Sequence, residues 1–187
     1  LPAEREAADT LLRRVGVAGE SYAVLAPGAS YGPAKRWDPA RFAEVAAYLD
    51  ARHGLCSVLV GTREDLEPAQ AVEWIAGECV VNLVGATDLP ALVGVLAGAA
   101  LVLSNDSGVM HLAAALGRPT VGLFGSTSPV WTSTAAPWVR NLYAAYPCSP
   151  CFRRTCPIGY GCLRALEPVP AIRAAAELLE RSVEMGA

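Results

Sequence analysis

One loop of the sequence combines glycines with hydroxyl and cationic side chains, as an anion-binding site requires. It spans residues 27–37, PGASYGPAKRW. Gly28 lets the backbone approach a ligand closely, Ser30 offers a hydroxyl, and Lys35 and Arg36 offer positive charge. The loop is neither a GxGxxG dinucleotide loop nor a Walker loop ending in Gly-Lys-Ser/Thr. It indicates a site for an anionic group such as a diphosphate, and the alternative is an ordinary turn with two solvated cations.

A second loop, residues 104–111 (SNDSGVMH), leads into a predicted helix that begins at Gly108. The free backbone N–H groups of a helix N-terminus bind anions. Asp106 would repel a diphosphate, so we expect it to accept hydrogen bonds from sugar hydroxyls or to cap the helix. His111 lies on the first turn beside the expected anion, and a purely structural histidine is the alternative.

Two shorter loops offer further polar groups. In the segment 61–65, Thr62 and Glu64 follow a predicted strand, and Glu64 could accept the two hydroxyls of a ribose or complement the helix dipole. The segment 125–129 (GSTSP) contains Ser126, which could contact a base or a phosphate or belong to a plain turn.

These loops must be positioned by short apolar segments that alternate with helical ones. Strands are predicted at 22–26, 57–61, 80–84, 101–104 and 120–124, with helices at 39–53, 63–76, 88–99 and 108–116. Such alternation predicts an α/β fold with a doubly wound, Rossmann-like parallel sheet, in which ligands bind beyond the carboxyl ends of the strands. All four polar loops follow predicted strands, so we expect them at one edge of the sheet. Beyond Ser126 the pattern weakens until a last predicted helix at 169–185.

Composition and charge exclude several classes of protein. The 187 residues are 53% hydrophobic and 18% charged, which is ample for a core. The net charge of −3 gives no electrostatic case for a nucleic-acid partner. No apolar run reaches the roughly 18 residues that span a bilayer, and the start is not a signal peptide. We expect residues 1–20 to be a linker or the tail of a preceding domain, and residues 21–187 to form the ligand-binding domain.

Four of the six cysteines gather in a segment at 147–163. Their spacing, Cys148-x2-Cys151-x4-Cys156-x5-Cys162, leaves three states open: a structural zinc site, free thiols or disulfides. The neighbouring Arg153 and Arg154 offer charge to an anionic group, although solvated arginines are the default.

Taken together and in this order, the segments 27–37, 104–119 and 122–129 resemble the ADP-heptose:lipopolysaccharide heptosyltransferases of glycosyltransferase family 9. The resemblance covers nearly the whole chain and is closest to the heptosyltransferase II members. It implies the C-terminal half of a two-domain GT-B glycosyltransferase, with the donor site in this half and the general base in an absent N-terminal domain. Family members transfer heptose from ADP-heptose to the lipopolysaccharide inner core with inversion, and no cofactor is required for catalysis.

The resemblance also assigns roles to residues. Lys35 would stabilise the leaving nucleotide, and Glu64 would hold the ribose. The implied donor-binding set is Gly28, Ser30, Lys35, Thr62, Glu64, Asp106, Ser107, Gly108, Val109, His111 and Ser126. The implied partners are ADP-heptose and, through the absent domain, the lipopolysaccharide core. The implied location is the cytoplasm, with at most peripheral association with the inner membrane.

Three alternatives stay open at this point. The chain could be a nucleotide-sugar-binding module without turnover, or a zinc-binding interaction domain built around the four cysteines. It could also be a GT-B-like sugar-nucleotide epimerase, which would need its own acid and base carboxylates, whereas the loop 104–111 offers only Asp106.

Overall fold

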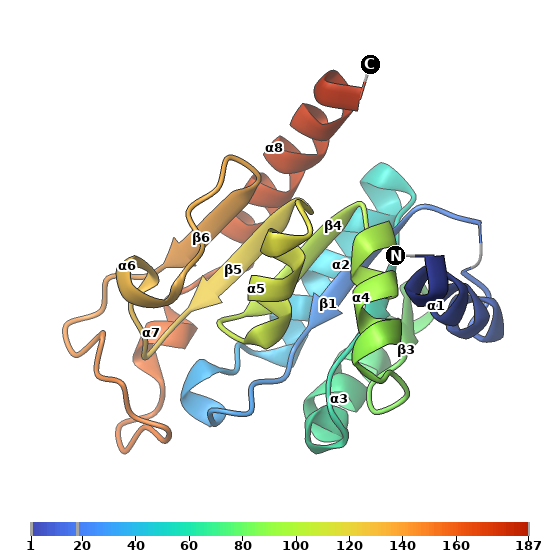
Figure 1. The fold of residues 1–187 in the computed structure, drawn as a ribbon. Coiled ribbons are helices and arrows are strands. Elements are labelled where there is room, and N and C mark those ends of the chain that lie inside the picture. The colour runs from blue at the N-terminus through green and yellow to red at the C-terminus, as the bar shows by residue number, and fades with distance from the viewer. Residues whose placement is uncertain (1, 18, 187) are drawn as a thin grey trace.

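The computed structural model describes residues 2–17 and 19–186, which form a parallel six-stranded sheet (Figure 1). The strand order is β3-β2-β1-β4-β5-β6, and all pairs are parallel. The strands are β1 (Tyr22–Ala26), β2 (Cys56–Leu59), β3 (Val80–Asn82), β4 (Leu101–Asn105), β5 (Thr120–Phe124) and β6 (Val139–Tyr143). The order reverses between β1 and β4, and this switch point is where doubly wound sheets bind their ligands.

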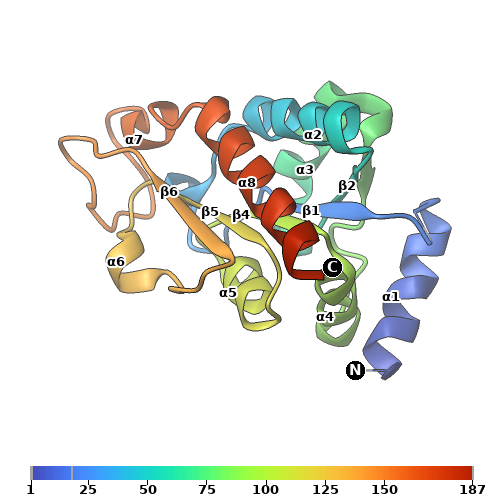
Figure 2. The ribbon, with the colours of Figure 1, turned by 90° about the horizontal axis from the view of Figure 1, so that it is seen from above.

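Helices cover both faces of the sheet, as Figure 2 shows from above. On one face α2 (Pro39–His53), α3 (Leu66–Ala76) and α8 (Pro168–Gly186) enclose a core that includes Phe42 and Leu178. On the other face lie α4 (Leu89–Gly98) and α5 (Gly108–Ala115). The predicted doubly wound α/β fold is confirmed. No helix in the described part of the chain has the length and apolarity needed to cross a bilayer.

Short elements complete the chain. Five of them are single turns: η1 (Pro33–Lys35), η2 (Arg63–Asp65), η3 (Gly77–Cys79), α6 (Pro129–Thr132) and α7 (Gly161–Arg164). Two aspartates cap their helices: Asp38 accepts a hydrogen bond from the N–H of Ala40 at the start of α2, and Asp88 accepts one from that of Ala91 at the start of α4.

The strand β6 was not predicted. Its sequence, VRNLY, places Arg140 and Asn141 in the middle of the segment, and only Val139 is fully buried. An edge strand of this kind lacks the continuous apolar run that marks the central strands. The strand therefore lies in the region beyond Ser126 where the pattern weakens and where no strand was predicted.

The first helix, α1 (Pro2–Arg14), packs against α4. Ala8 and Leu12 are buried in this contact, and a Cβ atom on Gly94 would collide with the backbone carbonyl of Glu4. The helix thus shares the core on the α4 face of the sheet. The assignment of residues 1–20 to a linker or a preceding domain stays a prediction.

Candidate functional site

The two predicted anion-binding loops meet at the carboxyl edge of the sheet, at the switch point between β1 and β4. Lys35, at the end of η1, donates a hydrogen bond from Nζ to Oδ2 of Asp106 at 2.6 Å. The ring of Tyr31 lies 4.7 Å from the same ammonium. Because β1 and β4 are neighbours, residues 71 positions apart in the chain form one site.

The Asp106 side chain is only 2% exposed, and its carboxylate is held by several donors. Oδ2 also accepts hydrogen bonds from Oγ1 of Thr127 at 2.6 Å and of Thr132 at 3.3 Å. Nε2 of His111 lies 3.8 Å from Oδ1. A buried carboxylate requires such pairing. Asp106 therefore fixes the position of the Lys35 ammonium, and sequence reasoning missed both threonines.

The N-terminus of α5 faces open space beside this ion pair. Its N-cap residue is Ser107, which excludes Asp106 as the helix cap. The Ser107 side chain makes no capping bond, and its hydroxyl lies 3.1 Å from that of Ser104 instead. A Cβ atom added to Gly108 would meet nothing within 4 Å. The first-turn N–H groups at Gly108 and Val109 therefore have no side-chain cap, which is the feature by which the start of a helix can bind an anion.

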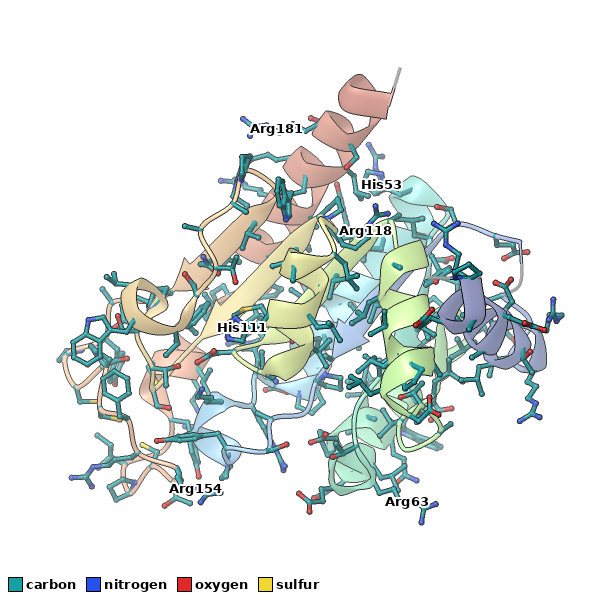
Figure 3. All side chains as sticks on the ribbon, viewed as in Figure 1. His53, Arg63, His111, Arg118, Arg154 and Arg181 are labelled. Carbon is teal, nitrogen blue, oxygen red and sulfur yellow. The ribbon has the colours of Figure 1, made fainter. Side chains whose placement is uncertain are left out.

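His111 lies on the first turn of α5, beside the open end of the helix (Figure 3). Its side chain is 44% exposed, and Nδ1 lies 3.4 Å from Oγ1 of Thr134. The direct ligand contact of His111 stays a prediction.

A buried amide that sequence analysis missed holds the loop 27–37 in place. Asn105 is fully buried, and its Nδ2 donates to the carbonyls of Pro27 at 2.7 Å and Gly28 at 3.3 Å. Its Oδ1 accepts a hydrogen bond from the N–H of Trp37 at 3.1 Å. One side chain thus fixes both ends of the loop that carries Lys35. The only signal in the sequence was a polar residue at the end of an apolar strand.

The segment 61–65 packs against the same loop through Asp65. Oδ2 of Asp65 accepts hydrogen bonds from the backbone N–H and the hydroxyl of Thr62 at 3.0 and 2.9 Å. A Cβ atom on Gly28 would collide with the Asp65 side chain, so a glycine is needed at this contact. Glu64 is exposed on η2 at this edge. The direct ligand contacts of Thr62, Glu64 and Gly28 stay predictions.

Ser126 connects the loops rather than lining an open surface. It is 1% exposed; its N–H donates to the carbonyl of Ala34, and its carbonyl accepts from the N–H groups of Cys151 and Phe152. Its hydroxyl has no hydrogen-bond partner among the described residues. Ser30 is exposed nearby. Direct ligand contacts of Ser30 and Ser126 stay predictions.

The six cysteines are free thiols in this structure, so the disulfide alternative does not occur in it. Within residues 2–17 and 19–186, no group of three or more His, Cys, Asp or Glu side chains could hold a metal ion. Backbone N–H groups of Ile158 and Tyr160 lower the pKa of Cys156, whereas burial raises the pKa of Cys162. Because the four clustered cysteines form no such group of metal ligands, they do not fit a zinc ion as they are arranged here.

The other two thiols belong to Cys56, at the start of β2, and Cys79, at the end of η3. Both are half-buried and pack against the two cores of the domain. Burial raises the pKa of each.

The family model for glycosyltransferase family 9 (heptosyltransferase) matches residues 2–160. A lipooligosaccharide heptosyltransferase 2 of Campylobacter jejuni is 35% identical over 172 residues, covering 88% of this chain and 53% of that protein. The Haemophilus influenzae protein of the same name is 42% identical over 111 residues, covering 57% of this chain and 32% of that protein. The solved structure of an E. coli ADP-heptose lipopolysaccharide heptosyltransferase II matches with a TM-score of 0.80 and 28% identity.

That structural match covers 95% of this chain and 52% of the E. coli chain. The chain thus spans about half the length of the structure, and no more than 53% of either curated relative reported above.

Proposed function

The chain belongs to glycosyltransferase family 9, and we propose that it forms the donor-binding, C-terminal half of a GT-B heptosyltransferase. Its donor is ADP-heptose, and the complete enzyme transfers the heptose to the lipopolysaccharide inner core with inversion. The observation that carries the proposal is the convergence of the Lys35 ammonium and the open N-terminus of α5 at the switch point of the sheet. The ammonium of a lysine and the free N–H groups at the start of a helix are both donors to a pyrophosphate, and pairing with Asp106 offsets part of the charge of Lys35.

In this proposal the residues have separate tasks. The N–H groups of Gly108 and Val109 bind the diphosphate, and Lys35 neutralises the charge that develops on the leaving ADP. Asp106 holds the Lys35 ammonium at 2.6 Å, two residues before the start of α5. His111 contacts the diphosphate or the heptose, and Glu64 binds the ribose hydroxyls.

Departure of ADP leaves negative charge on the diphosphate, and stabilisation of that charge is the contribution of this half to the reaction. The general base that activates the acceptor hydroxyl belongs to the other half, as the family resemblance implies. The acceptor core binds there as well. Catalysis requires no cofactor. A structural zinc ion on Cys148, Cys151, Cys156 and Cys162 would require the segment 147–163 to rearrange.

The same site would serve a nucleotide-sugar-binding module without turnover, which is the second candidate. An epimerase is disfavoured because the two buried carboxylates of this edge, Asp65 and Asp106, are both engaged by neighbouring side chains.

Calorimetric titration with ADP, ADP-heptose, a UDP-sugar and NAD tests the proposal. We expect ADP and ADP-heptose to bind more tightly than the other two ligands. A Lys35→Ala change should weaken ADP binding by about 1.5–3 kcal/mol, since it removes a charge-assisted contact. Arg52→Ala, on the exposed surface of α2, is the matched control and should have no effect. Tighter binding of the UDP-sugar would refute the donor assignment. Heptose transfer by this chain alone would refute the assignment of the general base to an absent domain.

A further inference from the structure

The cysteine-containing segment 147–163, which has no task in the proposed donor site, is bonded to the loop 27–37. Nε of Arg154 donates to the carbonyl of Tyr31 at 2.7 Å, and the carbonyl of Arg154 accepts a hydrogen bond from the N–H of Ala34 at 3.1 Å. Figure 1 shows the segment between β6 and α7 at the same edge of the sheet as the loop after β1, and Figure 3 shows Arg154 at this edge. Arg154 therefore contacts the turn that leads to Lys35 with both its side chain and its backbone.

The two segments approach so closely that one position of the turn has no room for a side chain. Gly32 has a φ of +141°, and a Cβ atom added there would lie 2.7 Å from the carbonyl oxygen of Arg154. The N–H of Phe152 donates to the carbonyl of Ser126 at 2.8 Å, and the N–H of Ser126 donates to the carbonyl of Ala34 at 3.3 Å. Backbone groups thus join the segments that follow β1, β5 and β6.

Tyr31 connects this backbone network to the side chain of Lys35. Its ring centroid lies 4.7 Å from Nζ of Lys35 and 5.7 Å from Cζ of Arg154. Its hydroxyl donates to the carbonyl of Phe152 at 2.5 Å, while its own carbonyl accepts the bond from Arg154, so both ends of the residue are held. An aromatic face attracts a cation within about 6 Å of its centre. The Lys35 ammonium is therefore held by two groups, the carboxylate of Asp106 and the ring of Tyr31.

We propose that Tyr31 and Arg154 are positioning residues for Lys35, and that the segment 147–163 acts on the donor site through them. Neither residue has to touch the donor in this role. Tyr31 restricts the place of the ammonium, and Arg154 keeps Tyr31 in its position. The effect on ADP binding rests on the proposed function, whereas the effect on the ammonium can be measured without any ligand.

Acetylation of Lys35 in the absence of ADP tests the positioning, since Lys35 is the only lysine of the chain. Its side chain is 12% exposed and paired, so it should react slowly with acetic anhydride. Tyr31→Leu removes the ring and should raise the rate roughly 2–5-fold, as expected for the loss of a cation–π contact. Tyr31→Phe keeps the ring and should retain most of the protection. Arg154→Met keeps the aliphatic stem but loses the guanidinium donors, and it should raise the rate as Tyr31→Leu does.

Arg153→Met is the matched control, because Arg153 is exposed like its neighbour and takes part in none of these bonds. It should leave the acetylation rate unchanged, and circular dichroism confirms that each variant is folded. Faster acetylation in Tyr31→Leu and Arg154→Met, but not in Arg153→Met, supports the proposal. An unchanged rate in Tyr31→Leu, an equal increase in Tyr31→Phe, or an equal increase in Arg153→Met overturns it.

Calorimetric titration with ADP separates the positioning role from the proposed function. Affinity for ADP should fall roughly 2–5-fold in Tyr31→Leu and Arg154→Met, because the same contact with Lys35 is lost. Full ADP affinity in both variants would overturn the role of these residues in donor binding. If acetylation is faster in the variants but the unsubstituted chain binds no ADP, the proposed function is contradicted and the positioning of Lys35 stands.

Discussion

The ammonium of Lys35 lies 2.6 Å from the carboxylate of Asp106, and both side chains are largely shielded from solvent. Asp106 has two further donors, Thr127 and Thr132, so its charge is distributed over three partners. The pair therefore fixes a cation at the switch point of the sheet before any ligand arrives. Preorganised charge of this kind is more effective than a flexible surface lysine.

Removal of the cation should leave the carboxylate buried without its charged partner. We expect Lys35→Met to lower the free energy of unfolding by about 2–4 kcal/mol. The double variant Lys35→Met/Asp106→Asn should be less destabilised than the sum of the single variants by about 1.5 kcal/mol, because the two side chains interact directly. Urea denaturation of the four proteins measures the cycle. Additive effects would show that the interaction between the two side chains contributes nothing to the free energy of unfolding.

Asn105→Ala should loosen the loop that carries Lys35, although Asn105 itself is buried and contacts no ligand. It removes the partners of the Pro27 carbonyl and the Trp37 N–H in a buried place, which should cost about 2–3 kcal/mol of stability. ADP binding should fall as well, because the loop that carries Lys35 loses its anchor. Asn82→Ala is the control, since the Asn82 side chain bonds Glu73 and the N–H of Val84 at the end of β3, away from this loop. Unchanged ADP affinity in folded Asn105→Ala would contradict the positioning role.

Two glycines should respond in opposite ways to the same substitution. A Cβ atom on Gly28 collides with Asp65, so Gly28→Ala should destabilise the fold by about 1–3 kcal/mol. A Cβ atom on Gly108 meets open space, so Gly108→Ala should change stability by no more than about 1 kcal/mol. It should nevertheless lower ADP affinity, because the methyl group occupies the approach to the helix N-terminus. Thermal melting and calorimetry separate the two effects, and full ADP affinity in Gly108→Ala would count against the anion site.

The clustered thiols should differ in reactivity. Backbone donors lower the pKa of Cys156, whereas burial raises that of Cys162. At a pH below both pKa values, a lower pKa gives a larger thiolate fraction, so Cys156 should react faster with iodoacetamide. The rate for Cys156 should also level off at a lower pH as the pH is raised. Peptide mass spectrometry over a pH series measures both rates, and faster labelling of Cys162 would contradict the described loop.

Much of this arrangement could be predicted from local sequence. The strands β1 to β5, the caps at Asp38 and Asp88, and the loops beyond the strands all follow from apolar runs and short motifs. Because parallel strands end at one edge of the sheet, the meeting of the Lys35 and Gly108 loops could be expected too.

The partners within the site could not be predicted in the same way. Asn105 donates a hydrogen bond to the carbonyl of Gly28, 77 positions away in the chain. Asp106 accepts one from the hydroxyl of Thr127, 21 positions away. Such pairs depend on the packing of loops, which has no periodic pattern in the sequence. The edge strand β6 was missed for a related reason, since Arg140 and Asn141 interrupt its apolar pattern.

Lys35 is the only lysine in the 187 residues, so an amine-reactive reagent reports on it individually. Its modification by acetic anhydride, followed by peptide mass spectrometry with and without saturating ADP, tests the diphosphate site most directly. The account predicts that ADP slows acetylation of Lys35 strongly and leaves the chain's α-amino group unaffected. If ADP binds by calorimetry while Lys35 is acetylated at an unchanged rate, the nucleotide lies elsewhere and the assignment of this site is wrong.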